Sequence, residues 1–161
     1  MAAKTGTYTL IASTTLGSAG SVTFSSVPQT YTDLVLVVNV VASQSPVNGG
    51  LRFNNDSGTN YSSTRITGDG SSATSSRDTN DDVLRTGVVS TNSAVISQIF
   101  DYANTTTYKT VLSRAGGSGD RVAAFVGMWR NTAAITTVTV TNLSYPAGTT
   151  FKLYGIEAGN L

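Results

Sequence analysis

Short apolar segments alternate along the whole chain with clusters of Ser, Thr, Asn and Gly, and this alternation limits most strongly what the chain can fold into. Apolar side chains at every second position are typical of half-buried β-strands, and clusters of small polar residues are typical of turns. Many short strands separated by turns predict an all-β protein, either a sandwich or a barrel. The strands are predicted at Tyr8–Ser13, Ser21–Phe24, Leu34–Ser43, Leu51–Asn54, Ser62–Thr67, Val83–Ser90, Ala94–Tyr102, Tyr108–Ser113, Arg121–Arg130, Ile135–Thr141 and Thr150–Ile156.

The composition argues against a helical fold. Long helices are normally built from Ala, Leu, Glu, Lys, Gln and Arg, but charged residues make up only 12% of this chain and Glu157 is its single glutamate. The chain of 161 residues contains no Gly/Ser-rich linker, and a chain of this size can bury roughly 68–70% of the surface that it exposes when unfolded. We therefore predict a single domain over residues 1–161, in which residues 1–7 form an N-terminal arm.

The absence of two residue types excludes several kinds of catalytic site. The chain has no Cys, which excludes disulfides and a cysteine nucleophile, and no His, which excludes the Ser-His-Asp triad and the commonest general base. Duplex DNA is bound mainly through many Lys and Arg contacts to its phosphates, and a net charge of +1 does not indicate such a basic surface. The longest apolar run, Leu34–Ala42, is far shorter than the ~20 residues of a membrane-spanning helix. We expect a soluble protein with no cofactor and no nucleic-acid or membrane partner.

The polar loops contain most of the carboxylates that could bind a metal ion or act in catalysis. The stretch Ser71–Asp82 is the most polar and least periodic one, and it predicts an exposed loop. Two segments, Asn54–Asn60 and Asp78–Asp82, are rich in the oxygen ligands that Ca²⁺ prefers. Neither has the spacing of an EF-hand, and Asn, Asp and Gly are also the residues of tight turns, which is the interpretation that we favour. Because most aspartates lie in such turns, we predict no catalytic residue and no metal ligand.

The strand at Leu34–Ser43 is unusual because it is apolar on both faces. One face carries Leu34 and the alternate residues after it; the other carries Val35, Val37, Asn39 and Val41. A strand of a two-layer sandwich should be apolar on one face only. Either another part of the subunit covers the second face, or a neighbouring subunit does. In the second case Asn39 would fix the register between chains; in the first it would bond to an adjacent loop. We predict Val35, Val37, Asn39 and Val41 as a subunit interface.

Aromatic residues and arginines supply the other candidate contacts. Trp129, the only tryptophan, is interpreted as a core residue packed between sheets, with stacking on a sugar ring as the alternative. Tyr61 lies close in sequence to Arg65, and Tyr, Trp and Arg are enriched at protein interfaces. A short polar terminus before the first strand is free to order on a neighbour. The predicted partner contacts are Lys4, Thr5, Tyr61, Arg65 and Arg77.

Most of the chain resembles a known group of proteins. The segment YTLIASTTLGSAGSVTFSSVPQTYTDLVLV at Tyr8–Val37 resembles the opening of small virion structural proteins of tailed bacteriophages. The resemblance continues in LRFNNDSGTNYSSTRITGDGSS, in GMWRNTAAITTVTV and in GTTFKLYGIEAG, whereas Thr79–Ala94 is the least similar part. The resemblance implies an antiparallel β-sandwich of jelly-roll type and a structural role, with no catalytic residues.

Such proteins serve as capsid cement or decoration proteins, or as domains of fibres and tail tips. The short chain and its few charges favour a decoration protein on the capsid surface of the virion. The implied partner is the major capsid protein of the same virion, and the implied assembly is a homotrimer. The alternative is a receptor-binding or glycan-binding module of a tail or head fibre, in which case a cell-surface glycan is the ligand. An enzyme, such as a depolymerase, is the least favoured class.

Overall fold

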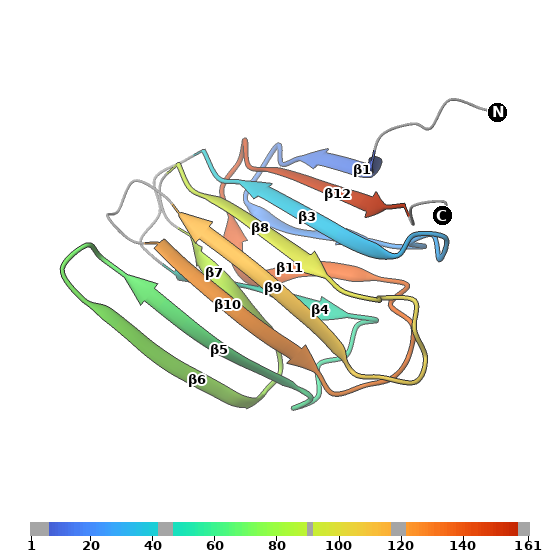
Figure 1. Cartoon of the computed structure of the whole chain (residues 1–161). Helices are drawn as coiled ribbons and strands as arrows, with labels where there is room; N and C mark the ends of the chain where they lie inside the picture. The colour runs from blue at the N-terminus through green and yellow to red at the C-terminus, as the bar shows by residue number, and fades with distance from the viewer. Residues whose placement is uncertain (1–6, 42–46, 90–91, 117–121, 158–161) are drawn as a thin grey trace.

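The computed structural model describes residues 7–41, 47–89, 92–116 and 122–157, and within these ranges it contains strands and no helix (Figure 1). The all-β fold expected from the alternation is confirmed. The strands are β1 (Tyr8–Thr15), β2 (Gly20–Phe24), β3 (Asp33–Asn39), β4 (Val47–Phe53), β5 (Tyr61–Gly68), β6 (Ala73–Asp81), β7 (Leu84–Val89), β8 (Ala94–Ile99), β9 (Lys109–Gly116), β10 (Val122–Trp129), β11 (Val138–Tyr145) and β12 (Thr150–Ile156).

Two antiparallel sheets of unequal size pack face to face as a sandwich. The larger sheet has eight strands in the order β1-β12-β3-β8-β9-β10-β5-β6, and the smaller has four in the order β2-β11-β4-β7. Figure 1 shows the larger sheet in front of the smaller one, with the hairpin β5–β6 at one end and β1 at the other. The first and last strands pair along their length, from Tyr8 with Ile156 to Thr15 with Thr150.

The strand pairs are nested in sequence. The outermost pair is β1 with β12, and inside it follow β2 with β11, β3 with β8 and β4 with β7. A jelly roll contains eight strands arranged as two Greek keys, and we interpret the nested pairing of these eight strands in that way. Two further hairpins, β5–β6 and β9–β10, widen the larger sheet. The sandwich is confirmed, and its jelly-roll type stays our interpretation.

The core lies between the sheets and is built from alternate residues of each strand. In β3, Leu34, Leu36 and Val38 point inward and are buried, which confirms the face predicted for them. The neighbouring strand β12 contributes Phe151 and Leu153. The smaller sheet adds a second apolar layer of Val22, Phe24, Leu51, Phe53, Val138 and Val140. Trp129 is 1% exposed and packs against Phe53 and Tyr61, so it is a core residue.

Two glycines let large side chains pack directly on the larger sheet. A Cβ on Gly127 of β10 would lie 2.6 Å from Leu84 of β7, so the absence of a side chain admits Leu84. A Cβ on Gly155 of β12 would lie 2.2 Å from the ring of Tyr31. These contacts place β7 beneath β10 and fix the loop before β3 on the sheet.

The structure corrects several strand boundaries, and two of these corrections concern the larger sheet. Residues 73–81, predicted as part of an exposed loop at Ser71–Asp82, form the edge strand β6, which is exposed as expected. An edge strand with no layer beneath it buries neither face, so it carries no apolar alternation. The strand at Leu34–Ser43 ends as β3 at Asn39, and Ser43 lies outside the described residues.

Candidate binding surface

The face of the eight-stranded sheet that points away from the smaller sheet carries many apolar side chains. Partners in the antiparallel ladders share a face. One ladder row runs from Tyr154 through Val35, Gln98 and Leu112 to Val126. The next row contains Lys152, Val37, Ile96, Arg114, Ala124 and Ile66. We call this surface the outer sheet face. It extends over all eight strands of the sheet, from β1 to β6.

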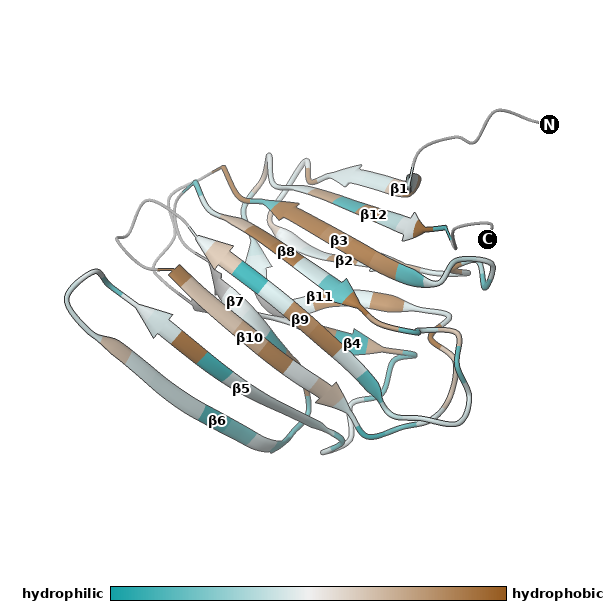
Figure 2. Ribbon diagram, in the orientation of Figure 1, coloured by the Kyte–Doolittle hydropathy of each residue, from teal (hydrophilic) through white to brown (hydrophobic). Residues whose placement is uncertain are grey.

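Most of the large exposed apolar residues of the described chain lie on this face, with Val41 and Tyr108 as the exceptions. Val122 is 67% exposed, Ile66 61% and Val126 53%. Tyr8, Leu10, Ile96, Leu112 and Met128 are also exposed there. Figure 2 shows apolar residues along β3 and across β8, β9 and β10, while β6 is polar along nearly its whole length. Single exposed apolar residues are ordinary, but a contiguous apolar patch marks an interaction site.

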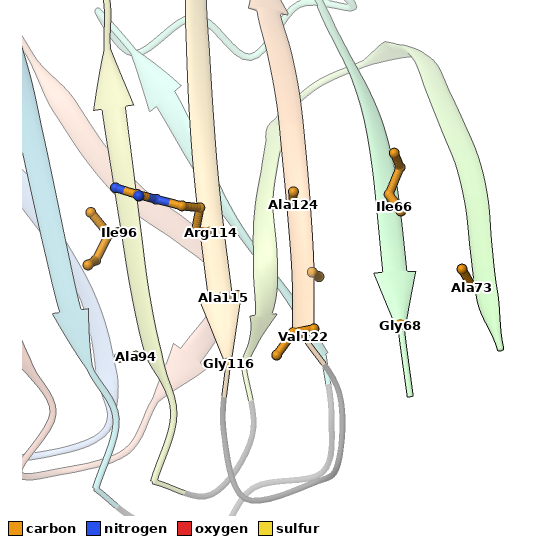
Figure 3. Close-up of a pocket in the computed structure, with 11 residues that line it drawn as sticks. Ile66, Gly68, Ala73, Ala94, Ile96, Arg114, Ala115, Gly116, Val122 and Ala124 are labelled. Carbon is orange, nitrogen blue, oxygen red and sulfur yellow. The ribbon is translucent and has the colours of Figure 1, made fainter. Parts of the chain in front are cut away.

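The outer sheet face is hollowed on both sides of Arg114. The larger hollow, of about 750 Å³, lies over β8, β9, β10 and β5, and Ile66, Ile96 and Val122 line it (Figure 3). The smaller, of about 320 Å³, is lined by Tyr8, Val35, Val37, Gln98 and Tyr154. Arg114 and Ile96 line both hollows. Figure 3 shows the Arg114 side chain reaching from β9 across β8 toward Ile96.

The outer sheet face is cationic as well as apolar. Arg114 and Arg77 are exposed and Lys152 is half-buried, and within the described part of the chain none of the three has an ion pair or a hydrogen bond. The acidic residue on β3, Asp33, already accepts hydrogen bonds from Gln98 Nε2 at 3.1 Å and from the backbone N–H of Asp101 at 2.8 Å. Among the described residues Asp33 has no cationic partner and keeps its negative charge, but the three cations outnumber it, so this surface has a net positive charge.

The predicted interface residues of β3 lie on this face but differ in exposure. Val35 is buried and Val37 half-buried, and both line the smaller hollow. Asn39 is exposed in the single chain, so only a neighbouring copy could bury it as the oligomer interpretation requires. Val41 follows the end of β3 and is 54% exposed. Other strands of the sheet flank β3 at its edges and leave its outer face open.

The predicted partner contacts fall into different places. Lys4 and Thr5 lie outside the described residues, as does most of the predicted arm. Tyr61 is wrong as a surface contact, because its side chain is fully buried in the core. Arg65 pairs in register with Phe125, a core residue, and so points to the opposite face from the hollows. Arg77 pairs with Thr64 in the row of Val126 and lies on the outer sheet face.

The loop at Asn54–Asn60 is a turn, as we expected. Asn54 and Asn55 have positive φ angles of 51° and 59°. The Asp56 carboxylate accepts hydrogen bonds from Trp129 Nε1 at 2.7 Å, Asn60 Nδ2 at 2.9 Å and the Gly58 N–H at 2.9 Å. Desolvation by burial is the largest influence on Asp56 and raises its pKa, but these hydrogen bonds outweigh it and leave the pKa below the ordinary value. Asp56 therefore anchors Trp129.

The other polar clusters are also structural. Asp81 and Asp82 pair with Arg85 and Arg52 respectively. The described residues contain no group of three Asp or Glu side chains placed to hold a metal ion. Lys109 is 1% exposed, and its Nζ donates to the carbonyls of Thr107 at 2.9 Å and Thr132 at 3.1 Å, which ties two loops together. Burial lowers the pKa of Lys109, but its ammonium group is out of reach of a substrate.

The residues of β9 and β10 on the outer sheet face were not among the predicted contacts. The signal that could have revealed them lies in β10, where Val122, Ala124, Val126 and Met128 are apolar and alternate with the core residues Ala123, Phe125, Gly127 and Trp129. A strand that is apolar on both faces needs a second apolar layer. This is the same argument that singled out Val35 and Val37.

Comparisons with known proteins add no family. No protein-family model matches the chain, and no curated protein matches it. A solved structure from Shewanella oneidensis MR-1, described as a protein of unknown function, aligns with 98% of this chain and 79% of its own at 10% identity and a TM-score of 0.22. A TM-score this low carries no argument about fold or function. No helix in the described ranges is long and apolar enough to cross a membrane.

Proposed function

We propose that this protein is a non-enzymatic structural protein of a tailed-bacteriophage virion, which decorates the capsid surface by binding the assembled head. The observation that carries the proposal is the outer sheet face, a broad apolar surface that is open in the single chain. Together with the resemblance of Tyr8–Val37 and three further segments to virion proteins, it favours a protein that works by contact. The proposed partner is the major capsid protein, and no cofactor is part of the proposal.

A decoration protein of this kind acts by mass action. Because it binds the assembled shell and not the free shell subunits, binding stabilises the shell. An interface of standard size buries about 1,600 Å² in total and can supply several kcal/mol per copy. Many copies then act together against the internal pressure of packaged DNA. We propose a homotrimer as the bound form, with the contact between copies outside the outer sheet face, which is left for the shell.

The experiment is thermal release of DNA from virions with and without the protein. Particles are stripped of the protein or produced from a phage that lacks its gene, then heated while a DNA-binding dye reports release. We expect release at a lower temperature without the protein, and the original temperature after the purified protein is added back. Equal release temperatures for both kinds of particle would contradict the decoration role.

A second function is favoured by one specific observation. In the smaller hollow, Tyr8 and Tyr154 pack edge to face with ring centroids 6.4 Å apart, beside Gln98. Aromatic rings next to hydrogen-bonding side chains suit a sugar ring, and a glycan-binding module of a fibre would use this place. A glycan array probed with the wild type and with Tyr8→Ala tests it. Binding that Tyr8→Ala abolishes would favour the fibre function, and an array with no signal would exclude it.

A further inference from the structure

The outer sheet face offers two apolar hollows separated by one unpaired arginine, and this arrangement specifies what it can bind. We infer that its occupant is a surface of a different protein that inserts apolar side chains into both hollows and places a carboxylate on Arg114. The inference adds the chemistry of the partner's surface to the proposed function. It rests on the proposed function in one respect only, namely that this surface belongs to the capsid shell.

The area of the patch is sufficient for a specific interface. Side chains have full accessible areas of about 150–250 Å² for aromatic residues and somewhat less for aliphatic ones, so the exposed parts of the eight apolar residues amount to roughly 700 Å². The largest apolar patch on an ordinary monomer is about 300–600 Å². A standard interface takes about 800 Å² from each partner. The outer sheet face therefore approaches the area of a full interface before its polar rim is counted.

The charge of the face selects the kind of partner. A guanidinium that is covered by a partner without a counter-charge pays a large desolvation penalty. Arg114 lies between the hollows, so a partner that fills both also covers Arg114 and must supply an acceptor. A carboxylate is the matching group, because it can accept two parallel hydrogen bonds from a guanidinium.

The same charges argue against a second copy of this chain on this face. Two outer sheet faces pressed together would bring Arg77, Arg114 and Lys152 of both copies into one interface. Among its described residues each copy would offer only one carboxylate, Asp33, against these three cations, so most of the positive charge would remain without a partner. Like charges in a desolvated interface cost several kcal/mol in general. The acidic apolar partner is therefore a different protein.

Two independent binding experiments test the inference. In the first, a display library of random linear peptides is selected against the purified wild-type protein. We expect enriched peptides to carry an acidic residue flanked by apolar residues, and their affinity to fall at least about tenfold in Arg114→Gln and in Val126→Asp. Tyr108→Asp is the matched control, because Tyr108 is 53% exposed, as Val126 is, but lies in the loop before β9. It should bind the peptides as the wild type does.

Arg114→Gln keeps a long polar side chain at an exposed position, so it tests the charge without loss of the fold, and a thermal melt of each variant checks this. No enrichment, enriched peptides without an acidic residue, or equal binding by Arg114→Gln would each overturn the inference. An oligomer of the wild type that Val126→Asp dissociates would also overturn it, because the face would then bind a second copy.

The second experiment adds the same variants to stripped virions. If the wild type rebinds and Arg114→Gln does not, both the inference and the proposed function are supported. If both rebind equally, the proposed function stands and the inference fails. If the wild type does not rebind, the proposed function fails, and the peptide selection alone decides whether the face recognises an acidic apolar surface.

Discussion

Replacement of Asp56 by Ala should destabilise the core although Asp56 lies in a surface turn. Its carboxylate accepts the indole N–H of Trp129, whose side chain is only 1% exposed, and that donor has no other partner in the described chain. A buried donor left unpaired costs about 1–3 kcal/mol. The hydrogen bonds from Asn60 and Gly58 hold the turn and add to the loss. We therefore expect Asp56→Ala to lower the free energy of unfolding by about 2–4 kcal/mol.

The assay is thermal unfolding at neutral pH, followed by circular dichroism and by Trp129 fluorescence. For a domain of this size, 1 kcal/mol shifts Tm by roughly 2–4 °C, so the expected loss in Tm is about 5–15 °C. Asp69→Ala is the control. The Asp69 carboxylate also accepts several hydrogen bonds, from Ser71 and Ser72, but all of them lie in an exposed loop. Its removal should leave Tm unchanged. A Tm for Asp56→Ala equal to that of the wild type would refute the role given to Asp56.

The effect should also depend on pH. The folded-state pKa of Asp56 lies below its ordinary value, so the stability that it contributes is fully present above about pH 4 and is lost as the pH falls toward the folded pKa. The difference in stability between wild type and Asp56→Ala should therefore shrink in acid. A difference that grew as the pH fell would contradict the hydrogen-bonding account.

The remaining predictions concern packing and assembly. Gly155→Ala should lower the free energy of unfolding by about 1–3 kcal/mol because its new methyl group overlaps the Tyr31 ring; Gly17→Ala, with nothing within 4 Å, should not, and chemical denaturation of both compares them. Val37→Asp should leave the mass of the proposed trimer unchanged, as measured by light scattering after size exclusion, because the outer sheet face binds a different protein; dissociation would place Val37 in the contact between copies, as the sequence predicted.

The sequence predicted those parts of the fold in which burial leaves a periodic pattern. Leu34, Leu36 and Val38 alternate in β3, and the strand and its inward face followed from that alternation. The edge strand β6 left no such pattern, because Ser, Thr, Arg and Asp occupy both of its faces. Backbone hydrogen bonds pair β6 with β5. Backbone pairing requires no particular side chains at an exposed edge strand, so the sequence of β6 does not reveal it.

The candidate surface was predicted in part, for a similar reason. Val35 and Val37 stood out because they make β3 apolar on both faces. Tyr61 was misplaced because its proximity to Arg65 in sequence does not reveal that both positions point toward the smaller sheet. There the Tyr61 hydroxyl accepts a hydrogen bond from the Phe53 N–H in the core. The hollows beside Arg114 combine residues from strands that are distant in sequence, so only the strand order reveals them.

A cryo-electron reconstruction of purified virions tests the central claim most directly, because it shows both where the protein lies and which face it uses. The account predicts a regular lattice of this sandwich over the head, with the outer sheet face against the shell and Arg114 opposite an acidic side chain. Density confined to the tail or a fibre, or a head lattice in which the outer sheet face points to solvent, would contradict it.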